Sequence, residues 1–255
     1  MLRAALSSLR VHLRTTLVRP LYQVMILIQP IVIATLTYYV YRGSSPDNSF
    51  YVILGSGMSG MWMATAFSSA GDIGRERNTG TIHPVLLAPT PIWLVFAGRT
   101  LGALLLSAIP VGVSVTFSVL VFGVRFPADA SAAGLVIAVV AFGLSCHGFG
   151  LLLSNLFMLS RRTVVLQNFL EWPLLIASGV ILPVSALPVA FRWFAAILPM
   201  RWGAEAASRA YDGGGIAWGP IGLALGITAV YVAASVALWS RIERRIRVTA
   251  SLEVA

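Results

Sequence analysis

The 255-residue chain is dominated by apolar runs that are long enough to cross a lipid bilayer as helices. A spanning α-helix needs about 20 mostly apolar residues. Six segments meet this requirement: 22–40, 50–70, 92–124, 132–159, 164–182 and 216–239. The third is long enough to be tilted or to begin as an interfacial segment. Hydrophobic residues make up 58% of the chain and charged residues only 11%, which excludes an ordinary soluble enzyme. We therefore expect an all-α integral membrane protein with six transmembrane helices, organised as a single domain.

The 18 basic residues, all of them arginines, are unevenly distributed between the segments that connect these runs. Thirteen lie in segments that would face one side of the membrane. Four precede the first run, three lie in or just after the segment that follows the second run, two follow the fourth run, and four lie in the tail 241–255. Five lie in the segments that would face the other side: Arg42, Arg125, Arg192, Arg201 and Arg209. Because cytoplasmic segments carry the arginine excess, we expect both termini in the cytoplasm of a multi-pass plasma or inner membrane protein. An even number of spans requires both termini to lie on the same side, which agrees with this expectation.

The first 20 residues have the pattern of an amphipathic helix. Leucines recur at helical spacing, and arginines fall largely on another face: Leu2, Leu6, Leu9, Leu13 and Leu17 against Arg3, Arg10 and Arg14. This pattern predicts a helix that lies in the cytoplasmic membrane interface. The alternative is a frayed basic tail.

The lack of lysine has a direct consequence for function. A P-loop requires a lysine, so this chain cannot contain one, and any ATP that powers it must bind to another chain. We expect no catalytic residue, metal or cofactor here. The arginines lie between apolar runs, which indicates membrane topology rather than nucleic-acid binding. The single cysteine, Cys146, excludes an internal disulfide, and its apolar surroundings favour a packing role.

Two connecting segments differ from the rest of the chain. Segment 71–91 is the most polar stretch between the runs. Segment 183–215 is long and rich in Trp, Phe and Pro, so it is unlike a loop that extends into water. Non-helical backbone at membrane depth is tolerated only when it is buried in protein or lines a cavity. We therefore expect segment 183–215 to form short broken helices that re-enter the membrane from the external side.

At these two segments the sequence resembles the membrane subunit of ABC transporters of the ABC-2 permease type, the six-helix exporter family. The first motif consists of Glu76, Gly80-Thr81, Leu86-Leu87 and Thr90-Pro91. The second consists of Asn168-Phe169, Pro173-Leu174, Ser178-Gly179, Pro183, Leu187-Pro188, Leu198-Pro199 and Arg209. The resemblance extends over the whole chain in topology, including the amphipathic start.

The resemblance implies that segment 71–91 holds a coupling helix, which docks on an ATPase between the second and third spans. The coupling residues would be Glu76, Gly80, Thr81, His83, Leu86, Thr90 and Pro91. His83 stands where the family usually has an acidic residue, which indicates that the partner ATPase is matched to this permease. The implied partners are two ABC ATPase subunits, which bind ATP and Mg, and a second permease chain, identical or homologous. Membrane lipids surround the assembly.

Several residues in the predicted spans are candidates for a substrate pathway: Met58, Trp62, Phe67, His147, Asn168 and Glu171. Flexible Met and flat aromatic side chains suit a promiscuous apolar pocket, although ordinary packing explains them equally well. An ionisable group within a span is costly and often functional. Glu171 would contact substrate or an arginine of the second chain, or it would pair with Arg161 or Arg162 at the interface. His147 would face the pathway or pack against another helix.

Four residues of the re-entrant segment are candidates for an external gate: Pro183, Pro188, Trp193 and Pro199. The alternative for Trp193 is an amphipathic anchor at the outer interface. Two pairs with GxxxG spacing, Gly98 with Gly102 and Gly222 with Gly226, predict close approach between helices.

We expect an export permease that moves an amphiphilic or hydrophobic compound, such as a drug, an antibiotic or a lipid-like molecule. Export of a polysaccharide or a lipid-linked glycan is the first alternative. A secondary transporter is a lower alternative, since we find no inverted repeat and few intramembrane acids. The lowest is a rhomboid-like intramembrane protease, suggested by the Gly57–Gly60 motif around Ser59 together with His147.

Overall fold

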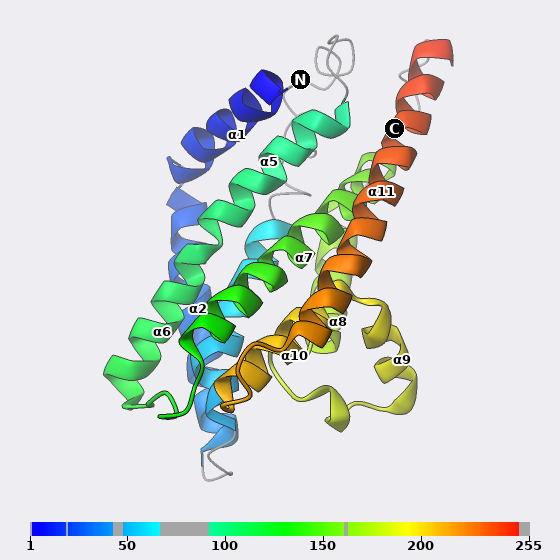
Figure 1. Ribbon diagram of the computed structural model, residues 1–255. Coiled ribbons are helices and arrows are strands. Elements are labelled where there is room, and N and C mark those ends of the chain that lie inside the picture. The colour runs from blue at the N-terminus through cyan, green and yellow to red at the C-terminus, as the bar shows by residue number, and fades with distance from the viewer. Residues whose placement is uncertain (1, 19, 43–47, 67–91, 161–162, 250–255) are drawn as a thin grey trace.

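The computed structural model describes residues 2–18, 20–42, 48–66, 92–160 and 163–249, and no strand occurs in these ranges. The elements carry the labels of Figure 1: α1 (Leu2–Leu17), α2 (Pro20–Tyr41), η2 (Tyr51–Gly55), α5 (Ile92–Leu106), α6 (Ala108–Phe122), α7 (Ala132–Leu159), α8 (Thr163–Ala177), η3 (Val184–Ala186), α9 (Val189–Ile197), α10 (Pro199–Tyr211) and α11 (Trp218–Thr249). The expectation of an all-α protein is confirmed for this part of the chain.

Three helical stretches of the described chain are long and apolar enough to cross a bilayer: Trp93–Phe122, Ala132–Met158 and Trp218–Arg241. They coincide with the third, fourth and sixth expected runs. A shorter apolar helix, Ile26–Tyr41, lies within the first run. The second run is helical from residue 48 to residue 66, and α8 ends at Ala177, short of the expected end of the fifth run. The count of six spans therefore stays a prediction.

The long apolar stretch of α5 and α6 is interrupted at Ser107. Pro110 lies in the first turn of α6 and has no N–H to donate to the carbonyl of Leu106, and its ring crowds that carbonyl. The Ser107 hydroxyl donates instead to the Leu104 carbonyl at 2.6 Å, and its N–H donates to Ala103 at 2.9 Å. A change of direction at this point follows from proline chemistry.

Helix α7 packs against α10, α11 and α5, and glycines bring the backbones close together. A Cβ atom on Gly203 of α10 would lie 2.8 Å from Cα of Phe142 in α7. A Cβ atom on Gly148 would lie 2.6 Å from the Thr228 methyl group of α11. These distances leave no room for a side chain, so the small residues set the helix spacing.

The two GxxxG pairs behave differently. A Cβ atom on Gly102 would lie 2.9 Å from the ring of His12, so close approach between α5 and α1 is confirmed there. Among the residues that the structure describes, no neighbouring atom lies within 4 Å of a Cβ atom placed on Gly222 or Gly226. The prediction of tight packing was therefore wrong for these two glycines within the single chain, because α11 turns that face away from its neighbours.

The N-terminal segment forms the helix α1 rather than a frayed tail. Its buried side packs on α5: the Ser8 hydroxyl donates to the Val95 carbonyl at 2.8 Å, and His12 is buried. Arg10 and Arg14 are exposed. The helix itself is confirmed, but its buried positions are His12 and Thr16, whereas Leu6 and Leu17 of the leucine stripe are exposed. The position of α1 in a membrane interface stays a prediction.

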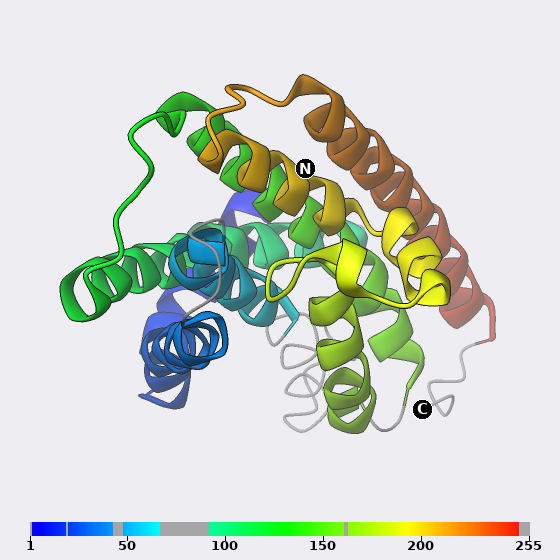
Figure 2. The same ribbon diagram turned by 90° about the horizontal axis from the view of Figure 1, so that it is seen from below.

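The start of α1 and the end of α11 lie at the same end of the bundle, and α9 and α10 lie at the other (Figure 1). Figure 2 shows this second end, where α10 runs across the bundle beside α7 and α11, with α2 and α6 on the opposite flank. Helix α11 continues to Thr249, so the expected tail 241–255 begins as a helix. This common end for both termini agrees with an even number of spans.

Candidate functional site

A pocket of about 230 Å³ lies at the end of the bundle that carries α10. Its walls come from the π-helical turn η2, from the stretch that follows α8, and from α10. We call it the end pocket, and its lining residues are Tyr51, Ser178, Gly179, Pro183, Val184, Ser185, Arg201, Ala204, Glu205 and Ser208. A mixture of hydroxyl groups and two opposite charges distinguishes it from the apolar interior.

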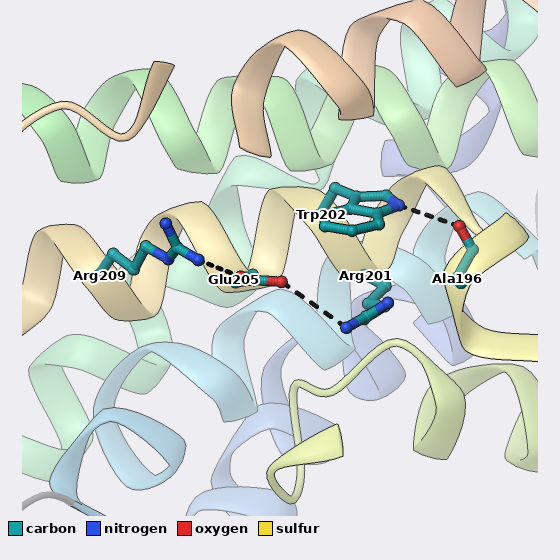
Figure 3. Close-up of polar contacts among 5 residues, drawn as sticks. All are labelled: Ala196, Arg201, Trp202, Glu205 and Arg209. Carbon is teal, nitrogen blue, oxygen red and sulfur yellow. Dashed lines mark hydrogen bonds and ion pairs between the residues drawn. The ribbon is translucent and has the colours of Figure 1, made fainter. Parts of the chain in front are cut away.

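One face of α10 carries a row of alternating charges at helical spacing (Figure 3). An Nη2 donor of Arg209 lies 2.6 Å from Oε1 of Glu205, and Nη2 of Arg201 lies 3.9 Å from Oε2 of the same carboxylate. The Arg201 guanidinium also lies 4.5 Å from the ring of Trp202, whose Nε1 donates to the Ala196 carbonyl at 3.0 Å. Two arginines against one carboxylate leave one net positive charge beside the pocket.

The wall opposite α10 is fixed in place by hydrogen bonds. Gly179 adopts a left-handed φ of 79°, a conformation that ends α8 and favours glycine. The Tyr41 hydroxyl donates to the Ile181 carbonyl at 2.9 Å. Arg192 donates from Nε to the Leu187 carbonyl at 2.7 Å and from Nη2 to the Ser185 carbonyl. The turn around η3 is thereby held from two sides.

Segment 183–215 does contain short broken helices, namely η3, α9 and α10, while its re-entry into the membrane stays a prediction. Of the four candidate gate residues, Pro183 lines the end pocket. Pro188 precedes α9, and Pro199 is buried in the first turn of α10, where its missing N–H costs nothing. Trp193 is 75% exposed on α9 and does not line the pocket. A gating role for these residues stays a prediction.

Met58 and Trp62, two of the candidate pathway residues, belong to the hydrophobic core. Trp62 is fully buried, its ring centre lies 5.8 Å from that of Phe149, and its Nε1 is 3.4 Å from the Glu171 carbonyl oxygen. Phe67 lies outside the described residues. Packing therefore accounts for both described side chains in this conformation.

Asn168 and Glu171 belong to different sides of α8. Asn168 is exposed in one stripe with Phe169 and Trp172, whereas Glu171 is only 6% exposed in a buried stripe with Gln167. No ion pair to the Glu171 carboxylate occurs among the described residues. Arg161 and Arg162, its suggested partners, lie outside them.

His147 is partly buried in α7, and its Nδ1 has no hydrogen-bond partner within the described part of the chain. Ser59, the nucleophile of the protease alternative, is fully buried and donates its hydroxyl proton to the Ser56 carbonyl at 2.6 Å. A serine nucleophile needs a base that accepts this proton. The geometry of Ser59 gives the protease reading no support.

Residues 6–211 match a family model that is described as ABC-2 type transporter. The chain belongs to this family. It is 28% identical over 185 residues to the "Probable multidrug ABC transporter permease YbhR" of Escherichia coli strain K12, and has the same identity to the protein of that name from Escherichia coli O157:H7. The match covers 71% of this chain and 49% of each relative. The chain thus spans about half the length of these relatives.

The matched family is one of ABC-2 type transporters, and both relatives are named as permeases. The segment that the resemblance assigns to contact with an ATPase, 71–91, lies outside the described residues. The roles expected for its seven residues therefore stay predictions: Glu76, Gly80, Thr81, His83, Leu86, Thr90 and Pro91.

Sequence reasoning missed the hydroxyl cluster around η2. The π-helical turn displaces backbone hydrogen bonds, and side chains of α6 take their place: Ser114 donates to the Ile53 carbonyl at 2.9 Å, and Ser118 to the Val52 carbonyl at 3.1 Å. Ser56 donates to the Val52 carbonyl at 2.6 Å. The signal available in the sequence was the pair Ser114 and Ser118, which stand four residues apart in an otherwise apolar run.

The charged row on α10 was also missed. The sequence analysis used Arg201 only as a topology signal, and Arg209 as a topology signal and a part of the second family motif. Glu205 stands four residues from each of them. This spacing is the signal for ion pairs along one helix face.

Proposed function

We propose that this chain is the transmembrane permease subunit of an ATP-driven ABC exporter. The cargo is an amphiphilic or hydrophobic compound, such as a drug, an antibiotic or a lipid-like molecule, which leaves the cytoplasm or the inner leaflet. The match of residues 6–211 to the ABC-2 family carries this proposal, and the name of the relatives, multidrug permease, favours a drug over a glycan.

The proposed assembly contains two permease chains and two ABC ATPase subunits. The ATPases bind ATP and Mg, and each docks on segment 71–91 of one permease. Closure of the ATPase pair moves the docked segments as rigid bodies. Pumping requires that the cargo bind more tightly in the inward-facing state than in the outward-facing state. Both termini lie in the cytoplasm of the plasma or inner membrane.

The place of segment 71–91 in the chain supports this route of coupling. It joins helix 48–66 to α5, so a movement of the segment acts directly on both. Helix 48–66 carries Trp62, whose indole contacts the backbone of α8, and α5 packs against α7 and α1. A displacement at the ATPase would thus reach five helices through the chain and existing contacts.

A pull-down of the tagged full-length chain from detergent extract tests the proposal. An ABC ATPase should co-purify with the native chain and with Asn78→Ala, a matched change in the same segment outside the motif. It should be lost from the double variant Glu76→Ala, Gly80→Arg. Absence of an ATPase from all three chains would overturn the permease assignment.

The purified complex, reconstituted into liposomes, tests the cargo class. We expect ATP-dependent movement of the amphiphilic dye Hoechst 33342, and no movement without Mg. Dye transport that runs on a proton gradient without an ATPase would instead support the secondary-transporter alternative.

A further inference from the structure

The end pocket presents hydrogen-bond donors that the protein itself does not use. Arg201 makes no hydrogen bond among the described residues, because its contact with Glu205 at 3.9 Å is too long for one. The Tyr51 side chain is only 9% exposed, lines the pocket, and has no hydrogen-bond partner for its hydroxyl in the described chain. Ser178 lines the same wall but offers no free donor, because its hydroxyl donates to the Leu175 carbonyl at 2.6 Å.

The charge balance of the pocket favours an anion. Glu205 is the acid that lines it, and the close contact with Arg209 at 2.6 Å compensates that charge. The Arg201 charge is left over, and a guanidinium presents paired N–H donors that match two oxygens of a phosphate. The pocket volume of about 230 Å³ is large enough for a phosphate with part of its ester group.

The surroundings indicate where such a phosphate comes from. Helix α10, which lines the pocket, lies at the end of the bundle away from the start of α1 and the end of α11 (Figures 1 and 2). Helix α9 lies next to α10 and exposes large apolar side chains, among them Phe191, Trp193 and Ile197. Exposed aromatic and aliphatic groups on a short amphipathic helix are typical of the membrane interface, which is the depth of lipid headgroups.

We propose that the end pocket binds the phosphate group of a phospholipid headgroup, with the Arg201 guanidinium and the Tyr51 hydroxyl as donors. The lipid belongs to the leaflet at the α9–α10 end, and its acyl chains lie along the apolar face of α9. Such a lipid would bind whether or not the chain exports a drug, so its failure to bind leaves the transport proposal intact.

Binding to the full-length protein in detergent tests this site with three probes. They are dioctanoyl phosphatidylglycerol, inorganic phosphate, and dioctanoylglycerol, which lacks the phosphate. We expect saturable binding of the phosphatidylglycerol, much weaker binding of inorganic phosphate, and none of dioctanoylglycerol above its partition into micelles.

Two variants remove one donor each. Arg201→Gln should raise the Kd for dioctanoyl phosphatidylglycerol by about tenfold or more, which corresponds to loss of a charged hydrogen bond. Tyr51→Phe keeps the ring and its stacking on Tyr41, so the fold is retained, and should raise the Kd by about three- to tenfold. Arg42→Gln removes an exposed arginine at the end of α2 and should leave the Kd unchanged.

Equal binding of dioctanoylglycerol would overturn the proposal, because the acyl chains would then account for the affinity. The proposal would also be overturned if neither Tyr51→Phe nor Arg201→Gln changed the Kd. If Arg201→Gln does not fold, Tyr51→Phe alone decides. Inorganic phosphate that binds as tightly as the lipid would overturn the lipid assignment and indicate a soluble phosphate ester.

Discussion

The indole Nε1 of Trp62 lies 3.4 Å from the main-chain carbonyl oxygen of Glu171, so that helix 48–66 and α8 are joined at their buried faces. Phe149 of α7 packs against the same indole, with ring centres 5.8 Å apart. Trp62 therefore connects three helices. Segment 71–91, the proposed ATPase contact, follows helix 48–66 in the chain, and Trp62 connects that helix to α8.

Two different substitutions of Trp62 should destabilise the protein by different amounts. Trp62→Phe loses the contact with the carbonyl and some ring area, and should cost about 1 to 2 kcal/mol. Trp62→Ala leaves a cavity among three helices and should cost about 3 to 5 kcal/mol. Thermal unfolding in detergent measures both. A Trp62→Ala protein with an unchanged Tm would show that the indole does not hold these helices together.

Two glycine substitutions should have opposite consequences. Gly203→Ala places a Cβ atom 2.8 Å from Cα of Phe142, so α10 and α7 must separate, and we expect a loss of about 1 to 3 kcal/mol. Gly222→Ala meets nothing within 4 Å and should be neutral or stabilising by up to about 1 kcal/mol, because alanine favours the helix. The Tm values of the two variants test the difference. Equal shifts would contradict the packing of α10 on α7.

The π-helical turn η2 should depend on hydroxyl groups from α6. Ser114→Ala and Ser118→Ala each remove a donor to a buried carbonyl, and each should cost about 1 to 3 kcal/mol. Thr116→Ala is the matched control, since Thr116 lies on the exposed side of the same helix. Hydrogen exchange of residues 51–55 should rise in the two serine variants only. Unchanged exchange would show that the turn is stable without these donors.

The apolar runs predicted the helices well, because length and hydrophobicity are properties of the local sequence. The break at Ser107 was missed even though Pro110 is visible, since a run of apolar residues hides a change of direction. Asn168 and Glu171 were both candidates for the substrate pathway, yet their exposure differs, because the surrounding helices decide which stripe of α8 is covered. The end pocket could not be predicted at all, as its walls come from three distant segments.

The row of charges on α10 allows a variant that should strengthen lipid binding, whereas Arg201→Gln and Tyr51→Phe should weaken it. Glu205→Gln removes the negative charge from the end pocket and raises the net charge of the row from one to two positive charges. The Kd for dioctanoyl phosphatidylglycerol should therefore fall several-fold at low ionic strength, and this gain should shrink as salt is added. Stability should change by less than about 1 kcal/mol, because the pairs are partly exposed. Weaker lipid binding in Glu205→Gln would contradict the proposed role of Arg201.

The orientation of the chain can be tested with single engineered cysteines. Cys146 is fully buried, so a membrane-impermeant maleimide should not label the native protein in intact cells. Ala190→Cys places a thiol on the exposed surface of α9, and Ser251→Cys places one near the C-terminus. If the arginine excess marks the cytoplasmic side, intact cells should label the first and not the second, and permeabilised cells should label both. Labelling of Ser251→Cys in intact cells would reverse the predicted topology and place segment 71–91 out of reach of a cytoplasmic ATPase.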